Sequence, residues 1–125
     1  MSTNIDRATA VRRLVPINRL PPENQEALLD ACEFQTISDG QIVYLQRQQD
    51  DYVHYLVDGT VELLWNDKVV KRLPAESKAA RRPLAKPGRK RHTVRAVSNS
   101  TVLRIPRTQF DAQMEEGNLL TGPAR

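Results

Sequence analysis

The feature that most constrains the fold is a long β-prone segment interrupted by one Asp-Gly pair. Residues 52–57 and 60–65 are rich in tyrosine, valine and leucine, and Asp58-Gly59 separates them. Two such runs joined by Asp-Gly are the strongest short-range signal of a β-hairpin, because the turn needs residues that tolerate positive φ. We therefore expect a central hairpin, with at least one tyrosine packed in the core and His54 exposed or half-buried.

Other short segments with strand or helix patterns flank this centre. Helical spacing predicts a helix over 6–14, one that begins near Pro22 and ends at Cys32, and a short one over 106–114 docked by Phe110 and Met114. Strands are expected over 34–37, 42–45, 68–73, 93–97 and 101–105, with turn residues between them. Many short strands at close spacing predict a sandwich or a closed roll.

Several functional classes are disfavoured by the composition. The one cysteine, Cys32, cannot form an intramolecular disulfide or a cysteine zinc cluster, which favours a reducing, cytoplasmic setting. No run approaches the roughly 18 apolar residues that span a membrane. The two histidines, His54 and His92, are too few for a metal centre of the cupin type, and no nucleophile-base pattern is present. We expect a cytoplasmic, non-catalytic protein without a metal or a membrane anchor.

The positive charge of the chain is concentrated in one segment. The formal net charge is +4, yet residues 71–95 hold ten basic residues and one acidic residue, Glu76. Prolines stand at 74, 83 and 87 within a stretch that has no clear period. A long irregular segment inside a compact domain is usually functional or disordered. The segment is therefore the first place to look for an anionic ligand or partner.

Taken in order, these segments resemble the cyclic nucleotide-binding domain family, which includes the sensors of catabolite-activator-type regulators, kinase regulatory subunits and gated channels. The resemblance covers about residues 14–114. Its elements are Leu20-Pro21-Pro22-Glu23, the Gly40-Gln41-Ile42 turn, the central segment 48–63, Thr93-Val94-Arg95-Ala96 and Val102-Leu103-Arg104-Ile105. It implies a mainly-β α+β fold, a jelly-roll-like β-roll with short helices at both ends.

The resemblance also implies a domain organisation. We expect N-terminal helices in 1–33, the β-roll in 34–105, a C-terminal helix in 106–114 and a polar, fraying tail in 115–125. At 125 residues the chain is one domain, too short for a sensor and a separate effector. We expect either a stand-alone sensor or a fragment of a longer protein.

In the resembled family, the segment that corresponds to 74–92 is the phosphate-binding cassette. The family pattern opens with Phe-Gly-Glu, whose glutamate holds the ribose hydroxyl, and closes with a Pro-Arg-x-Ala-Thr run, whose arginine holds the phosphate. Aligned on Thr93, this chain has Lys90 at the arginine's position and His92 at the alanine's. Residues 79–85 replace the opening pattern and include Arg81 and Arg82. The resemblance therefore implies a degenerate cassette.

The candidate anion site consists of Arg81, Arg82 and Lys90 as positive charges and Thr93 as a hydroxyl donor. Because Arg89 and Arg91 flank Lys90, a one-residue slip in the loop would restore an arginine at the phosphate. Three interpretations of the basic segment stay open. It is a solvated loop without a ligand, an anion site altered toward a cyclic dinucleotide or a phospholipid head group, or a docking surface for an acidic protein or nucleic acid.

The resemblance predicts a non-catalytic regulatory module with lost or altered nucleotide binding and no certain cofactor. One alternative is a working sensor of a cyclic nucleotide or cyclic dinucleotide that signals through the helix after Pro106. Another is a basic-loop module that docks acidic protein or nucleic acid. A protein partner or further domains of a longer chain are expected. Specific nucleic-acid binding is not expected, because no aromatic residue lies between Trp65 and Phe110 on which bases could stack.

Overall fold

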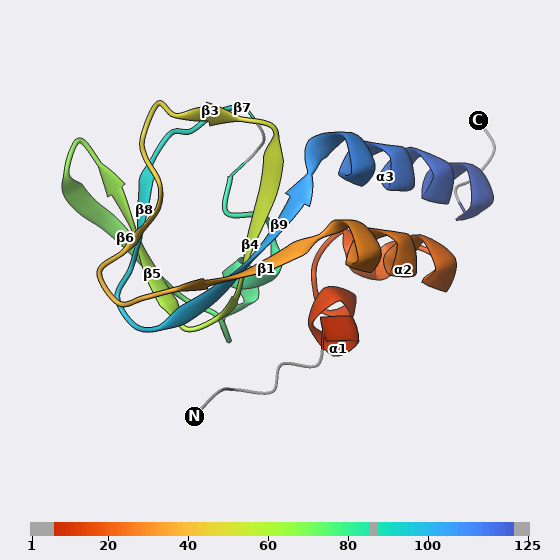
Figure 1. Ribbon diagram of the computed structural model, residues 1–125, viewed down its shortest axis with the longest axis horizontal. Coiled ribbons are helices and arrows are strands. Elements are labelled where there is room, and N and C mark those ends of the chain that lie inside the picture. The colour runs from red at the N-terminus through yellow and green to blue at the C-terminus, as the bar shows by residue number, and fades with distance from the viewer. Residues whose placement is uncertain (1–6, 86–87, 122–125) are drawn as a thin grey trace.

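Two antiparallel sheets and a two-stranded ribbon form a β-roll, with the helices gathered at one side (Figure 1). The structure, a computed structural model, describes residues 7–85 and 88–121. Its elements are α1 (Arg7–Arg12), η1 (Ile17–Arg19), α2 (Pro22–Ala31), β1 (Glu33–Ile37), β2 (Ile42–Tyr44), β3 (Gln49–Asp50), β4 (Tyr52–Asp58), β5 (Thr60–Trp65), β6 (Lys68–Pro74), η2 (Lys78–Arg81), β7 (Gly88–Arg89), β8 (Thr93–Ala96), β9 (Ser100–Pro106) and α3 (Arg107–Thr121). The mainly-β α+β fold class is confirmed.

The strand order shows how the chain winds between the two sheets. One sheet has the order β1-β9-β4 and the other has the order β2-β8-β5-β6, while β3 and β7 form the ribbon. In the ribbon, Asp50 lies opposite Gly88 and Gln49 lies opposite Arg89. The ribbon thus joins the end of the predicted cassette, 74–92, to the segment that precedes β4.

The predicted central hairpin is wrong in its pairing, although both strands are present. β4 pairs with β9, whereas β5 pairs with β6 and β8. Only Gly59, at φ 90°, stands between them, and it carries the chain from one sheet to the other. The two-residue hairpin lies one turn later, where Asn66 and Asp67 both have positive φ, as a type I′ turn requires.

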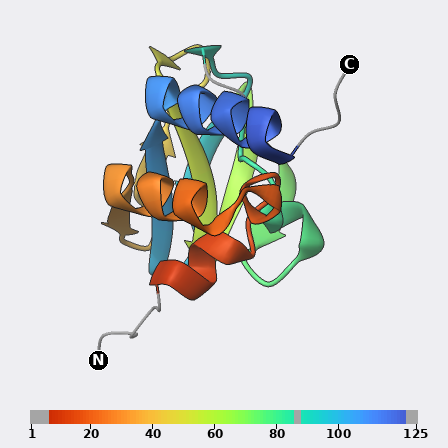
Figure 2. The same ribbon diagram turned by 90° about the vertical axis from the view of Figure 1, so that its right-hand side faces the viewer.

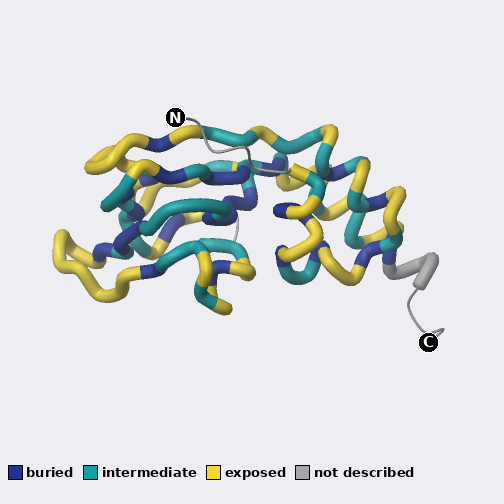
Figure 3. The backbone as a smooth tube through the Cα atoms, turned by 90° about the horizontal axis from the view of Figure 1, so that it is seen from below, coloured by how far each residue is buried: buried dark blue, intermediate teal, exposed yellow. Residues whose placement is uncertain are grey.

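β4 lies between two hydrophobic cores. Val53 and Tyr55 pack against the helices, while Leu56, on the opposite face, packs inside the roll. The hydroxyl of Tyr55 donates to the carbonyl of Val15 at 3.0 Å, which confirms that a tyrosine belongs to the core. His54 is only 4% exposed, so the expectation of an exposed or half-buried histidine was wrong. Buried segments run through the inside of the roll and along the helix-facing sheet (Figure 3).

The helices cover the outer face of the three-stranded sheet, and α2 and α3 lie side by side (Figure 2). Asn24 Nδ2 in α2 donates to Oε1 of Gln113 and of Glu116 in α3, both at 2.8 Å. Phe110 and Met114 pack on the core as predicted. α3 continues to Thr121, beyond the predicted end at 114, and the last part of the predicted tail, 122–125, lies outside the described residues. None of the described helices has the length and apolar character needed to cross a membrane.

Candidate anion-binding site

A cavity of about 540 Å³ opens beside the basic segment. The described residues that line it are Leu63, Leu84, Ala85, Arg89, Arg91 and His92. Leu63 comes from β5 and Arg89 from β7, while the others come from the loops that follow η2 and β7. The volume is typical of small-molecule sites. Because basic side chains line it together with apolar ones, and none of these six residues is acidic, the cavity is suited to an anion.

Backbone contacts hold the loops that line the cavity. Leu84 N donates to the carbonyl of His54 in β4 at 2.8 Å, which attaches the loop after η2 to the three-stranded sheet. Lys90 N donates to Gln48 O at 2.9 Å, and Arg47 N donates to Lys90 O at 2.8 Å, so the ribbon continues beyond β7. The positions of Arg89 and Arg91 are therefore fixed by main-chain pairing with segment 47–50.

Lys90 lies between these two exposed arginines, but its own side chain is buried. Its side chain is fully buried, its Nζ lies 3.1 Å from Oδ1 of Asp50, and the same nitrogen lies 5.2 Å from the ring centre of Tyr44. Successive side chains of extended backbone point to opposite sides, so Arg89 and Arg91 are exposed while Lys90 enters the interior. Lys90, the residue that the resemblance predicts at the phosphate, is thus engaged by the carboxylate of Asp50.

His54 lies beside Lys90, Asp50 and Tyr44 in the same buried region. Its ring centre lies 5.2 Å from that of Tyr44, and its buried Nδ1 has no hydrogen-bond partner in the structure. Burial lowers the pKa of His54 from 6.5 to about 4. Asp50 acts against this shift, and Lys90 and Arg104 add to it. Burial, reinforced by the Asp50 charge, raises the pKa of Tyr44 above its ordinary value. We call Tyr44, Asp50, His54 and Lys90 the Lys90 cluster.

The four residues predicted from the sequence do not converge on the cavity. Arg81 ends η2 and Arg82 follows it, both are exposed, and neither lines the cavity. The carbonyl of Arg81 instead accepts from Val15 N at 2.7 Å, beside the helices. Thr93 Oγ1 accepts from Gln46 N at 2.8 Å. The sequence pattern favoured Lys90 over Arg89 and Arg91 as the residue that contacts a phosphate. The signal that would have favoured the two arginines is the alternation of side chains along residues 89–91, which buries Lys90 and exposes its neighbours.

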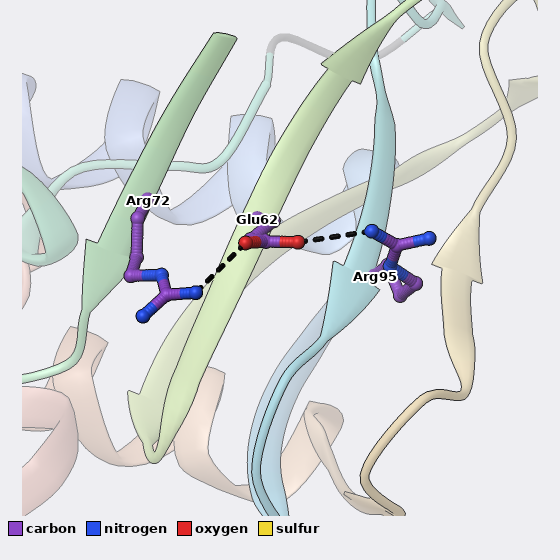
Figure 4. A network of polar contacts seen from close by, with 3 residues as sticks. All are labelled: Glu62, Arg72 and Arg95. Atoms are coloured by element: carbon purple, nitrogen blue, oxygen red, sulfur yellow. Dashed lines mark hydrogen bonds and ion pairs between the residues drawn. The ribbon is translucent and has the colours of Figure 1, made fainter. Parts of the chain in front are cut away.

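A second charged arrangement crosses the four-stranded sheet outside the cavity (Figure 4). Glu62 lies opposite Arg72 on β6 and Arg95 on β8, and one carboxylate oxygen accepts from each guanidinium at 3.0 Å. Both hydrogen bonds lower the pKa of Glu62, and the bond from Arg95 has the larger effect. Arg95, part of the segment that carries the family resemblance, is therefore used within the sheet. Across residues 7–85 and 88–121, no group of three or more His, Cys, Asp or Glu side chains could hold a metal ion.

The two sheets, the helices packed on one of them and the cavity at the loop between β6 and β8 define a β-roll domain with flanking helices. The family model described as "Cyclic nucleotide-binding domain" matches residues 34–116. The chain belongs to that family.

Solved structures from other organisms share the fold. A candidate cyclic nucleotide-binding protein of Ruegeria pomeroyi is 20% identical with a TM-score of 0.72, covering 88% of this chain and 51% of its own. The sensor domain of the transcriptional regulator DNR from Pseudomonas aeruginosa is 17% identical with a TM-score of 0.71, covering 87% of this chain and 80% of its own. A cyclic nucleotide-binding-like protein from Brucella abortus is 18% identical with a TM-score of 0.67. The match covers 89% of this chain and 99% of the Brucella chain.

The solved structures establish the fold, and the match of the family model to residues 34–116 establishes the family. The chain spans about half the length of the Ruegeria protein. No curated protein matches the chain.

Proposed function

We propose that this chain is a non-catalytic regulatory module whose cavity binds a phosphate-bearing ligand and whose recognition of cyclic mononucleotides is altered. The observation that carries the proposal is the placement of Arg89 and Arg91 on a cavity of about 540 Å³. Two guanidinium groups offer charged, directional donors to phosphate oxygens. The neighbouring His92 adds a further polar group to the same wall.

The altered recognition follows from two departures from the family pattern. The segment 79–85 lacks the Phe-Gly-Glu run, and none of the described lining residues is a carboxylate that could hold a ribose hydroxyl. At the phosphate position, Lys90 is paired with Asp50. For cyclic AMP and cyclic GMP, the cavity therefore offers no carboxylate among its described lining residues for the ribose hydroxyl. Their phosphate would contact Arg89 or Arg91 and not the residue at position 90. A cyclic dinucleotide carries two phosphates, so one phosphate can contact Arg89 and the other can contact Arg91.

The four residues predicted from the sequence keep supporting roles in this proposal. Lys90 holds the ribbon on which Arg89 lies, through its contact with Asp50. Thr93 accepts from Gln46 N and keeps its own hydroxyl proton as a donor. Arg81 and Arg82 are exposed, so they add to the positive potential that attracts an anion from solution.

A route from the cavity to α3 favours a sensor over a bare scaffold. Arg89 in β7 pairs with Gln49 in β3, and the residue after β3, Asp51, accepts from Arg107 N at 2.8 Å through its carbonyl. Arg107 is the first residue of α3. A ligand that draws Arg89 toward the cavity would bias the ribbon and, through Asp51, the start of the helix. The receiver of the signal is a protein partner or a further domain.

Calorimetric titration with cyclic AMP, cyclic GMP and cyclic di-GMP, at low and at physiological salt, tests the proposal. We expect saturable one-to-one binding, weaker for both mononucleotides than for cyclic di-GMP. Arg89→Ala and Arg91→Ala should each lower the affinity roughly 10- to 100-fold, the effect of losing a charged hydrogen bond. The matched control is Lys78→Ala, which removes an exposed positive charge that does not line the cavity.

Three results would overturn the proposal. The absence of heat with all three ligands would favour a module that uses the fold for docking alone. Loss of binding on Arg82→Ala but not on Arg91→Ala would move the site to η2. Equal loss in the Lys78 control would mean that only surface charge attracts the ligand, which salt would then screen.

A further inference from the structure

Strand β6 forms an unpaired edge of the four-stranded sheet. Among residues 7–85 and 88–121 it pairs only with β5, and in the order β2-β8-β5-β6 it stands at the end. In an antiparallel strand, alternate residues direct their N–H and C=O groups to each side, so half of those in β6 point away from β5. Such an edge is a ready template for another strand.

The first five side chains of β6 are exposed, and the charged ones among them are all positive. All five residues from Lys68 to Arg72 are exposed, and Val69 and Val70 keep 50% and 51% of their surface accessible. Lys68, Lys71 and Arg72 are basic, and the strand contains no acidic residue. Lys68 and Lys71 lie opposite Trp65 and Leu63, whereas Val69 and Arg72 lie opposite Leu64 and Glu62, with an irregular step at Val70. Basic side chains on both faces of the strand complement acidic side chains on a partner strand.

A second copy of the same strand is a poor occupant of this edge. Antiparallel pairing of two copies about Val70 would place Lys68 opposite Arg72, and a shift of half a residue would place Lys68 opposite Lys71. Like charges directly opposite each other destabilise a strand pair. Lysines on edge strands commonly prevent such self-association. The charge that excludes a second copy attracts an acidic strand.

Two neighbouring features extend the surface beyond the strand itself. Trp65, opposite Lys68, is 55% exposed at the end of β5. Exposed tryptophans are frequent anchors of protein interfaces. Arg72 uses one nitrogen for Glu62, yet its side chain remains 66% exposed. An acidic partner would contact Trp65 at one end of β6 and the exposed part of the Arg72 guanidinium at the other.

We propose that β6 is the docking edge for an acidic, extended segment of a partner protein, which adds a fifth strand to the sheet. Main-chain hydrogen bonds would supply affinity, and the three basic side chains of the strand would supply specificity for acidic residues. This inference does not depend on a ligand in the cavity.

The sole tryptophan of the chain, Trp65, reports directly on this edge. The probe is a short capped peptide that alternates glutamate and valine, added to the full chain. We expect a saturable blue shift of Trp65 fluorescence and slower amide hydrogen exchange over residues 68–72. The control probe is the same peptide with every backbone nitrogen methylated, which keeps its charge but removes its main-chain donors on both edges.

The variant Lys68→Glu should weaken binding at least tenfold, whereas Lys78→Glu, the same charge change on exposed η2, should not. Lys71 is avoided because it lies opposite Leu63, which lines the cavity. The Arg91→Ala variant should bind the peptide normally, which separates this proposal from the cavity ligand.

Equal binding of the methylated peptide or of a single-stranded oligonucleotide would overturn the proposal, since charge alone would then suffice. So would binding without protection of residues 68–72, or protection that grows with protein concentration in the absence of peptide. The last result would assign the edge to a second copy.

Discussion

Lys90 and Asp50 form an ion pair of 3.1 Å across the ribbon, with the lysine side chain fully buried and the aspartate 18% exposed. Asp50 Oδ1 also accepts from Tyr52 N at 3.2 Å. The pair joins the loop before β8 to the segment that leads into β4. It therefore withdraws Lys90 from the cavity and holds Arg89 and Arg91 at the cavity wall.

Breaking this pair from one side should be costly. Lys90→Met leaves the Asp50 carboxylate without its cation, so we expect the free energy of unfolding to fall by about 3 to 5 kcal/mol. The double variant Lys90→Met/Asp50→Leu should recover much of that loss, because neither charge is then left unpaired. Urea unfolding of the single and double variants measures the coupling.

The control for this prediction is an exposed ion pair. Arg107 contacts Asp51 and Asp111 with half of its side chain exposed, so Arg107→Met should cost less than about 1 kcal/mol. Equal losses for Lys90→Met and Arg107→Met would contradict the structural role given to the buried pair.

His54 should make the fold less stable in mild acid. Its pKa is about 4 when folded and 6.5 for the free side chain, so the unfolded chain binds more protons between these values. The contribution is fully present above pH 6.5 and is lost as the pH falls toward 4, by on the order of 3 kcal/mol. Urea unfolding between pH 7 and pH 4 should show this slope, and His54→Phe should flatten it. Identical slopes for the two proteins would refute the buried, neutral state of His54.

Gly59 and Gly40 provide a matched pair for testing the corner between the sheets. Both have positive φ, at 90° and 87°. A Cβ at Gly59 would clash with the hydroxyl of Ser100 and lie 2.7 Å from its Cβ, whereas a Cβ at Gly40 has nothing within 4 Å. Gly40→Ala should therefore cost only the backbone strain, about 1 to 2 kcal/mol, and Gly59→Ala roughly 1 to 3 kcal/mol more. Similar urea midpoints for the two variants would contradict the packing at the corner.

The acidity of Glu62 should depend on its two arginines unequally. The Arg95 hydrogen bond is the larger cause of its lowered pKa, ahead of that of Arg72. Replacing Arg95 with glutamine should therefore raise the pKa of Glu62 more than replacing Arg72, as followed by the NMR titration of the side-chain carboxyl carbon. The reverse order would contradict the larger role assigned to Arg95, whose side chain is 37% exposed against 66% for Arg72.

Sequence reasoning predicted the roll because each strand carries its own pattern. It missed how β4 pairs, because an Asp-Gly turn shows where the chain turns and not which strand each side then meets. It ended the last helix at Met114 because the following residues are polar, whereas Asn24 in α2 bonds to Gln113 and Glu116 and supports the longer α3.

The candidate site was harder to predict, for a similar reason. An alignment on Thr93 assigns one residue to the phosphate position by counting. Whether that residue faces the cavity depends on the pairing of the ribbon, which brings Asp50 to Lys90 from a distant part of the chain. The segment 79–85 raised the same difficulty, because Arg81 packs toward Val15 in the N-terminal region.

The most direct test of the central claim is an NMR titration of the arginine side-chain Nε–H signals with cyclic di-GMP at physiological salt. The account predicts saturable shifts at Arg89 and Arg91, with Arg81 and Arg82 changed little. Shifts confined to Arg81 and Arg82, or no shift at any arginine at millimolar ligand, would contradict it.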